Sequence, residues 1–422
     1  MIDARLCETP QGGIVVKLLF NVGSLIDGTG SPLRKNMSVL VEGGRITRIG
    51  AQGTIDAEGA TVIDAPDQTL IPGLIDTHFH LFLLLLKPVG GASEVTHMTD
   101  EMIATRVFKA ANAAKVWLQM GVTTVRDAGA GEFLAGAMQE AIRDGYTPGP
   151  RVIASGPLIA QTGGFRPGSG SHGVEVTGVD EARREARLHL KAGVDVVKIY
   201  GASTIGGGGG RLISEPGWTQ FTVEEMRAIV EEAHKPGRLT SCHTGSAQSI
   251  KNAIMAGVDF IDHATYMDQE CIDMLLATNT PIVPTQAIAW SLEHFGEKMG
   301  FGPHIARKSA EVSAVSMECL AKAYKAGVRI AAGTDADNPH ASLAKECELL
   351  VEIGMSNMEA LVAATKTAAE ILRLDATLGT VETGKIADVV LLDRNPLDDI
   401  RNLTTVARVF QSGKEVSIPS TI

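Results

Sequence analysis

Two histidines stand two residues apart at the end of an apolar segment, PGLIDTHFH. Side chains at positions i and i+2 of a strand project from the same face, so His78 and His80 would direct both imidazoles to one point. Two converging imidazoles suit a divalent metal ion. The pair alone is a weak pattern, because two hydrogen-bonded or solvated histidines give the same spacing. Its position directly after a predicted buried strand is what favours a metal site.

Three further candidate ligands each end an apolar segment: His243, His263 and Asp335. A single histidine beside an apolar strand is more often a hydrogen-bonded structural residue than a ligand. Here four histidines and one aspartate fall at equivalent ends of four strand-like segments, which is where barrel enzymes place their working side chains. The recurrence therefore predicts one shared metal site. His189 and His234 lie in predicted helices, and we expect them at the surface.

Lys198 ends another apolar segment, VDVVKIY. A buried ammonium without a partner is costly to desolvate, so the lysine pKa would fall and the neutral amine would become available. Reaction of that amine with carbon dioxide would give a carbamate, which bridges two cations as a carboxylate does. The alternative is a lysine paired with a nearby carboxylate.

The elements that would position these residues alternate between strand and helix patterns. Short apolar segments recur, separated by stretches with apolar residues at helical spacing. The eight strand candidates are LIPGLIDTHFH, GVTTVRDAG, RVIASG, VDVVKIYG, LTSCHTGS, VDFIDHAT, PIVPTQ and VRIAAGTDA. Repeats of this kind favour a closed (β/α)8 barrel of the TIM type over an open sheet.

A smaller domain is indicated at the two ends of the chain. The stretch 14–65 has the alternation and glycine punctuation of β-hairpins, and strand patterns return in KIADVVLLD and ARVFQSGKEV. We therefore expect an α/β protein in which residues 68–374 form the barrel. Residues 1–67 and 375–422 would together form a small β-sandwich domain.

Composition limits the classes of partner. The chain has 422 residues and a formal net charge of −11 without a long basic run, so it lacks the electrostatic footprint of nucleic-acid or anionic-membrane binding. A small-molecule substrate is expected. The five cysteines are scattered without CxxC spacing, and no secretory signal is visible at the N-terminus, so we expect a cytoplasmic location.

Two segments have alternative interpretations. The apolar run 81–86 is too short to span a bilayer and would face either the core or a partner subunit, so a homo-oligomer stays open. The glycine run 206–210 follows the fourth strand candidate and would be either a flexible connector or a lid over the substrate.

The chain as a whole resembles the amidohydrolase superfamily. The matching pieces are PGLIDTHFH, the lysine of VDVVKIY, the histidines of TSCHTGS and DFIDHAT, the aspartate of AAGTDA, and the flanking SLIDGTG and LGTVETGKIADVVLLDRNPLDDI. The resemblance implies that His78, His80 and Asp335 hold one metal ion. His243 and His263 would hold a second, with a carboxylated Lys198 bridging the pair.

The same resemblance implies a binuclear hydrolase of amide-type bonds. Two cations about 3.5–4 Å apart would lower the pKa of a bridging water toward ~7 and supply hydroxide. Asp335 would accept its proton and pass it to the departing amine. Imidazole and oxygen ligands suit zinc, although the same set accepts manganese, cobalt or iron.

Within the superfamily the chain is most similar to the branch related to imidazolonepropionase, which includes Xaa-Pro dipeptidases, carboxypeptidases that release basic residues, and ochratoxin-type amidases. The pieces that suggest this branch are GVTTVRDAG, QTGG and the HTG…AGVDFIDHAT spacing. Imidazolonepropionase itself uses one metal without a bridging lysine, so Lys198 argues against that activity. Phe165 and Gly245 stand where the dipeptidases tend to have polar contacts, which would make the pocket roomier and more apolar.

Four other residues are candidates for substrate contacts. Tyr200 and Tyr266 follow the fourth and sixth strand candidates and would donate a hydrogen bond to the developing oxyanion. Arg166 and His172, after the third, would meet a substrate carboxylate. Packing for the tyrosines, and surface solvation for Arg166 and His172, are the alternatives.

Three functions remain open on this sequence. The main one is hydrolysis of an N-acyl amino acid or a dipeptide. Hydrolysis of a urea, carbamate or anilide would use the same metal chemistry in a pocket of different shape. A non-catalytic scaffold of the same fold is the alternative from another class, and the complete set of candidate ligands counts against it.

Overall fold

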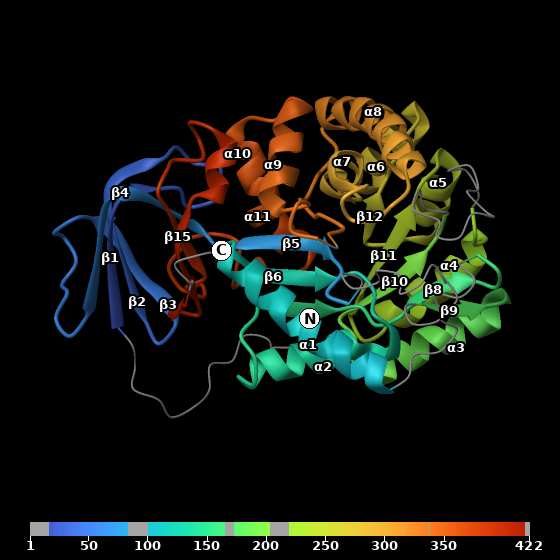
Figure 1. Ribbon diagram of the computed structural model, residues 1–422, viewed down its shortest axis with the longest axis horizontal. Helices are drawn as coiled ribbons and strands as arrows, with labels where there is room; N and C mark the ends of the chain where they lie inside the picture. Colours follow the sequence, from blue (N-terminus) through green and yellow to red (C-terminus); the bar gives the residue numbers. More distant parts are fainter. Residues whose placement is uncertain (1–16, 83–99, 165–172, 203–218, 337, 418–422) are drawn as a thin grey trace.

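The computed structural model describes residues 17–82, 100–164, 173–202, 219–336 and 338–417. Strands from both ends of the chain form one seven-stranded sheet in the order β16-β15-β14-β4-β1-β2-β3. They are β1 (Lys17–Leu25), β2 (Arg34–Glu42), β3 (Arg45–Ala51), β4 (Thr61–Pro72), β14 (Val389–Leu392), β15 (Val406–Gln411) and β16 (Lys414–Val416). This sheet lies on the left in Figure 1. The predicted pairing of the N- and C-terminal segments is therefore present.

The seven-stranded sheet curls over its own buried face. Phe20 of β1 and Phe410 of β15 make an edge-to-face contact with ring centroids 4.8 Å apart, although β4 and β14 lie between their strands. Neighbouring strands are about 4.8 Å apart, so a flat sheet would hold these two strands about 14 Å apart. Arg45, at the start of the edge strand β3, also forms a bridge with Ile386. The expected sandwich is thus one folded sheet rather than two separate sheets.

Parallel strands make up the larger part of the molecule. Three form one sheet, β5 (Leu74–Phe79), β6 (Val122–Asp127) and β7 (Arg151–Ala154), and six form another, β8 (Leu158–Gln161), β9 (Gly173–Val176), β10 (Val196–Tyr200), β11 (Leu239–Thr244), β12 (Phe260–His263) and β13 (Ile282–Val283). Single bridges continue the pairing beyond them, from Ile282 to Ile330 and from Phe79 to Ala336. The expected α/β architecture with parallel strands is confirmed.

Helices alternate with the parallel strands and pack outside them (Figure 1). They are α1 (Asp100–Gln119), α2 (Leu134–Arg143), α3 (Gly178–Lys191), α4 (Val223–His234), α5 (Ala247–Ala256), α6 (Gln269–Thr278), α7 (Gln286–Phe295), α8 (Pro303–Ala326), α9 (Leu343–Glu352), α10 (Asn357–Ala363) and α11 (Lys366–Ile371), with short 3-10 turns η3 (Gly131–Phe133) and η4 (Ile400–Thr404). Helices α4, α5 and α10 begin with capping boxes, at Thr222, Ser246 and Ser356. These satisfy backbone N–H groups that a helix start leaves without partners.

Two strand predictions differ from the structure. The eighth candidate, residues 328–336, forms no continuous strand, but it joins β13 and β5 through the bridges at Ile330 and Ala336 and through backbone hydrogen bonds. Its backbone turns at Asp335, where φ is 53°. An additional strand, β8, follows β7 and pairs with β10. Gly156, with φ of 70°, ends the third candidate segment, RVIASG, and separates β7 from β8.

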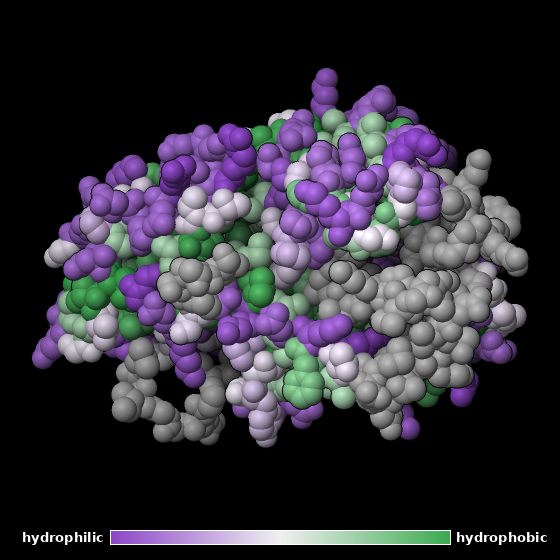
Figure 2. All heavy atoms as spheres, in the orientation of Figure 1, coloured by the Kyte–Doolittle hydropathy of each residue, from purple (hydrophilic) through white to green (hydrophobic). Residues whose placement is uncertain are grey.

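Other expectations concern burial and surface. His189 is fully buried in α3, contrary to the expected surface position, and its Nε2 lies 2.8 Å from the carbonyl oxygen of Pro157. His234 is 40% exposed, as expected. Hydrophilic side chains predominate on the face shown in Figure 2, and hydrophobic ones gather over the seven-stranded sheet. Among the described residues, no helix is both long and apolar enough to cross a membrane.

Candidate metal centre

Three of the predicted ligands meet at the carboxyl end of β5. His78, His80 and Asp335 each offer a ligand atom, and these atoms all lie within 4.8 Å of one another. Asp335 Oδ1 is 3.4 Å from His78 Nε2 and 3.1 Å from His80 Nε2. The two histidines are buried, whereas the Asp335 side chain is 23% exposed. A buried pair of imidazoles beside a more accessible carboxylate is a donor set that fits a divalent cation.

The other two predicted histidines extend this cluster. The ring of His263 lies 4.8 Å from that of His78 and 4.3 Å from that of His243, measured between centroids. Tyr200 stacks on the far side of His243, with centroids 4.5 Å apart and planes inclined by 20°. The four histidines and Tyr200 therefore form one continuous group at the carboxyl ends of β5, β10, β11 and β12, with Asp335 beside it.

The backbone has a positive φ at three positions in and beside the cluster. His263, Thr285 and Asp335 have φ values of 69°, 53° and 53°. A positive φ is uncommon for a residue with a side chain, and least favourable for a β-branched one such as Thr285. Strain of this kind persists where the surroundings enforce it, and it clusters at functional sites. Here it turns side chains from the ends of strands toward a common centre.

In three of the four histidines, Nδ1 points to a neighbouring residue. Nδ1 of His78 lies 2.9 Å from Asp262 Oδ1, and Nδ1 of His80 lies 3.3 Å from the Gly129 carbonyl oxygen. Nδ1 of His263 lies 2.7 Å from Thr285 Oγ1. In each of these three rings Nδ1 lies beside an oxygen of a neighbouring residue, which leaves Nε2 for a ligand. Metal-binding histidines almost always have such a partner on the second nitrogen.

Lys198 is buried and pairs with Asp262. Asp262 also accepts a 2.6 Å hydrogen bond from Arg126 NH2, and Arg126 donates to Ser241 Oγ at 3.1 Å and to the Thr77 carbonyl oxygen. The alternative considered for Lys198, pairing with a carboxylate, is therefore the arrangement that the structure has. Because Asp262 contacts both Lys198 and His78, it links the lysine to the cluster.

Arg126 and Asp262 belong to the site and were missed by the sequence analysis. Both lie in apolar strand candidates, GVTTVRDAG and VDFIDHAT. A charged residue in a buried strand needs a partner, because desolvation of an isolated charge is costly. That reasoning singled out Lys198, and it would have found these two residues as well.

The charge states in this cluster suit metal binding. Burial lowers the pKa of His243 to about 3, and it also lowers the pKa values of His78 and His263. For His80, burial lowers the pKa, but hydrogen bonding to Asp335 and the charge of that carboxylate outweigh it and raise the value. A metal ion needs deprotonated ligands, and three imidazoles are held in that form by burial.

Burial also lowers the pKa of the Lys198 amine, even though Asp262 opposes the shift. Burial would raise the pKa of Asp262, but Arg126 and Lys198 hold it well below its ordinary value. The buried carboxylate thus stays ionised between two cationic side chains. A lysine with a lowered pKa is closer to the neutral amine that reacts with carbon dioxide.

Of the remaining predicted site residues, the structure describes only Tyr266. Phe165, Arg166 and His172, like the glycine run 206–210, lie outside the described residues. Tyr266 is half-buried, and burial raises its pKa, with further contributions from Cys319 and Glu311 of α8. The groups that shift its pKa besides burial therefore lie on α8 and not in the histidine cluster.

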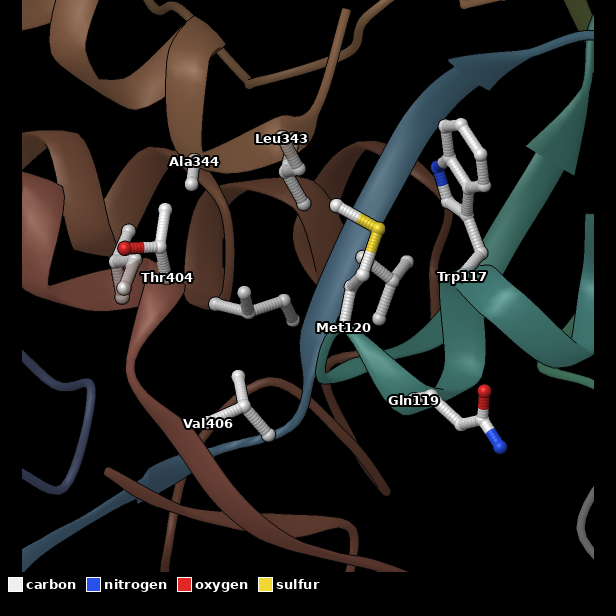
Figure 3. Close-up of a pocket in the computed structure, with 10 residues that line it drawn as sticks. Trp117, Gln119, Met120, Leu343, Ala344, Thr404 and Val406 are labelled. Atoms are coloured by element: carbon white, nitrogen blue, oxygen red, sulfur yellow. The ribbon is translucent and has the colours of Figure 1, made fainter. Parts of the chain in front are cut away.

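An apolar cavity lies at the other end of the strands. Its walls include Leu74, at the start of β5, and Trp117 and Met120 near the end of α1. Figure 3 shows Trp117 and Met120 facing Leu343 and Val406 across the space. His78 and His80 stand at the opposite end of β5, so this cavity is separate from the metal centre.

Parallel strands that carry histidines and an aspartate at their carboxyl ends define a class, the metal-dependent hydrolases of the amidohydrolase type. Residues 69–416 match the amidohydrolase family, and the chain belongs to that family. It is therefore a metal-dependent hydrolase. The family and its solved structures imply a TIM barrel with a small domain.

Individual relatives agree with the branch inferred from the motifs. Ochratoxinase of Aspergillus niger is 32% identical over 94% of this chain and 83% of its own length. The crystal structure of a Xaa-Pro dipeptidase with methionine bound in its active site is 33% identical, with a TM-score of 0.84 over 94% of this chain and 99% of that one. Phenylurea hydrolase B is 26% identical, with a TM-score of 0.77 over 95% and 96% of the two chains.

Proposed function

We propose that the chain is a binuclear metal hydrolase of amide bonds, with a closed eight-stranded barrel around the site. The observation that carries this proposal is the convergence of His78, His80, His263 and Asp335. In each of these histidines Nδ1 lies beside an oxygen of a neighbouring residue. His78, His80 and Asp335 would hold one ion. His243 and His263 would hold the second, and Lys198, carboxylated on Nζ, would bridge them.

Bound divalent cations, zinc being the expected choice, would supply Lewis-acid polarisation of the scissile carbonyl and a water of lowered pKa. Asp335 has the accessible carboxylate of the group, and its neighbours His78 and His80 hold its pKa well below the ordinary value against the opposing effect of burial. As an ionised base it can accept a proton at Oδ and return it to the leaving amine. Asp262 and Arg126 fix the positions of Lys198 and His78.

The substrate class proposed is an N-acyl amino acid or a dipeptide. Likeness to a Xaa-Pro dipeptidase and to ochratoxinase supports it. Gly245, two residues after His243, is buried and has no side chain, which leaves room beside the reacting bond for a bulky acyl or amine group.

A metal analysis combined with a hydrolysis screen tests the proposal. We expect about two equivalents of bound cation and turnover of some dipeptides or N-acyl amino acids. Lys198→Ala should lower kcat/KM by more than about 1000-fold, because it removes the bridging group and leaves Asp262 with one fewer partner. Lys251→Ala is the control, since Lys251 of α5 pairs with the exposed carboxylates of Asp268 and Glu270. A chain without stoichiometric metal would refute the binuclear site.

A second candidate substrate class is favoured by the likeness to phenylurea hydrolase B. Ureas, carbamates and anilides share the same carbonyl chemistry and differ in the shape of the pocket that they need. Including phenylureas and anilides in the screen separates the two classes. Turnover of these compounds, with no hydrolysis of N-acyl amino acids or dipeptides, would replace the first assignment by the second.

Tyr200 is the proposed oxyanion donor. Its ring stacks on that of His243 at the carboxyl end of β10. Tyr200→Phe keeps the stacking and removes the hydroxyl, so we expect kcat to fall about 100-fold while metal content stays constant. An unchanged kcat would leave Tyr200 with a packing role only.

A further inference from the structure

Helix α7 begins without a cap from its own N-cap residue. Thr285 occupies the N-cap position with φ of 53° and makes no capping hydrogen bond. Its hydroxyl lies instead 2.7 Å from His263 Nδ1. Helices α4, α5, α6, α9 and α10 are each capped by their own N-cap side chain. In α7 the hydroxyl that would satisfy the helix start is directed to the histidine.

Glu346 of α9 takes over the missing cap. Its side chain is fully buried, and Oε2 accepts a 2.6 Å hydrogen bond from the backbone N–H of Ala287. Burial raises the pKa of the Glu346 carboxyl to about 8, although its contacts with the start of α7 oppose the shift. A carboxylate at a helix N-terminus is stabilised by the exposed N–H groups and by the helix dipole. The first turn of α7 is therefore anchored by a residue 59 positions further along the chain.

The first turn of α7 determines which ring nitrogen of His263 carries the proton. Binding of a cation at His263 Nε2 requires the proton on Nδ1, so Nδ1–H must donate to Thr285 Oγ1. A β-branched residue at positive φ is unfavourable and relaxes unless its surroundings hold it. Glu346, which accepts the N–H of Ala287 two residues further on, holds the first turn of α7 and with it Thr285.

We propose that Glu346 is a positioning residue for the metal centre: by capping α7 from α9, it keeps the Thr285 hydroxyl on Nδ1 of His263. The inference rests on the proposed function, since it takes His263 as a metal ligand. Glu346 itself touches neither substrate nor cation.

Zinc affinity, measured by competition with a chromophoric chelator, tests the chain of contacts apart from catalysis. Thr285→Val keeps the shape and loses the hydroxyl, and we expect the dissociation constant of the weaker zinc ion to rise about 10- to 100-fold. Thr285→Ser restores the hydroxyl and should restore the affinity to within about threefold. Glu346→Gln keeps one acceptor oxygen and replaces the other by an amide NH2 group, so we expect a smaller rise in the same direction.

The double variant decides whether Glu346 acts through Thr285. If it does, Thr285→Val combined with Glu346→Gln should bind zinc no more weakly than Thr285→Val alone. Additive losses, or an unchanged affinity in Thr285→Val, would overturn the inference. Should Glu346→Gln fail to fold, the Val and Ser variants at position 285 still decide the hydroxyl's role.

Two controls separate the inference from the proposed function. Ser356→Ala removes the cap of α10 and should lower the unfolding midpoint without changing zinc affinity. His263→Ala should abolish binding of the weaker zinc ion. If His263→Ala retains both ions, the proposed ligand set is wrong. If His263→Ala loses one ion while Thr285→Val does not weaken binding, only the role of Glu346 and Thr285 falls.

Discussion

Gly333 lies against the first histidine of the metal centre. A Cβ at this position would come within 2.8 Å of His78 N, 2.9 Å of His78 Cβ and 2.6 Å of Val283 Cγ1. Gly333→Ala must therefore push β5 and β13 apart, at a cost of about 1–3 kcal/mol. Because His78 moves with β5, we also expect weaker metal binding and a lower kcat. Urea unfolding and metal titration measure the two effects.

Gly136 provides the matched control, because it lies inside α2 and a Cβ there meets nothing within 4 Å. Gly136→Ala should stabilise the protein by up to about 1 kcal/mol, since alanine loses less backbone entropy in a helix. Full metal affinity in Gly333→Ala would show that β5 accommodates the methyl group without displacing His78.

Single residues were predictable where their type was unusual for their position. Lys198 and the strand-end histidines stood out because charge or imidazole at the end of an apolar strand needs a reason. The partners of these residues did not stand out: which carboxylate meets Lys198 depends on strands 64 positions apart in the chain. Likewise His189 was expected at the surface, because its helix alone does not reveal that the Pro157 carbonyl faces its ring.

Elements were predictable in kind and less so at their ends. Apolar periodicity located α1, α4 and seven of the eight strand candidates, because burial of one face imposes it. The eighth segment is joined to β13 and β5 by single bridges and backbone hydrogen bonds but is not a continuous strand. Local patterns do not show that its backbone turns at Asp335, whose N–H donates to the His78 carbonyl oxygen at 2.7 Å.

The packing of α3 on α4 depends on one buried carboxylate. Glu232 accepts hydrogen bonds from Arg187, Lys235 and Arg183, and these lower its pKa to about 2. Its side chain is only 5% exposed. Since the folded-state pKa lies below the ordinary 4.5, the stabilisation is complete above pH ~4.5 and is lost as the pH falls toward 2.

Glu232→Gln should therefore lower the urea midpoint at pH 7, and the difference from the unmodified protein should shrink steadily below pH ~4.5. Glu231→Gln is the control one residue away, since Glu231 is 50% exposed where it meets Arg183 and exposed ion pairs contribute little. A midpoint difference for Glu232→Gln that is constant with pH would assign the effect to packing rather than to charge.

At the scale of the whole molecule, the chain ends build one unit and the middle builds the other. Phe20 and Phe410 lie in a hydrophobic cluster of their own, separate from the clusters that surround the parallel strands. The sequence indicated that both ends contribute strands, but not that the sheet curls, because curvature depends on contacts between strands that are not neighbours. The domain boundaries stay a prediction, and β4 crosses the expected one at residues 67 and 68.

The separation of these cores predicts that stability and metal binding can be changed independently. Phe410 is 1% exposed, and Phe410→Ala should destabilise the protein by about 3–5 kcal/mol through the cavity it leaves. Phe108→Ala is the exposed control at 77% exposure and should have little effect. Metal raises the unfolding midpoint by binding the folded form, and we expect the same increment in Phe410→Ala as in the unmodified protein. A smaller increment would mean that the curled sheet is coupled to the histidine cluster. Strand β4 offers the direct route, because it ends at Pro72 and only Gly73 separates it from β5, which carries His78.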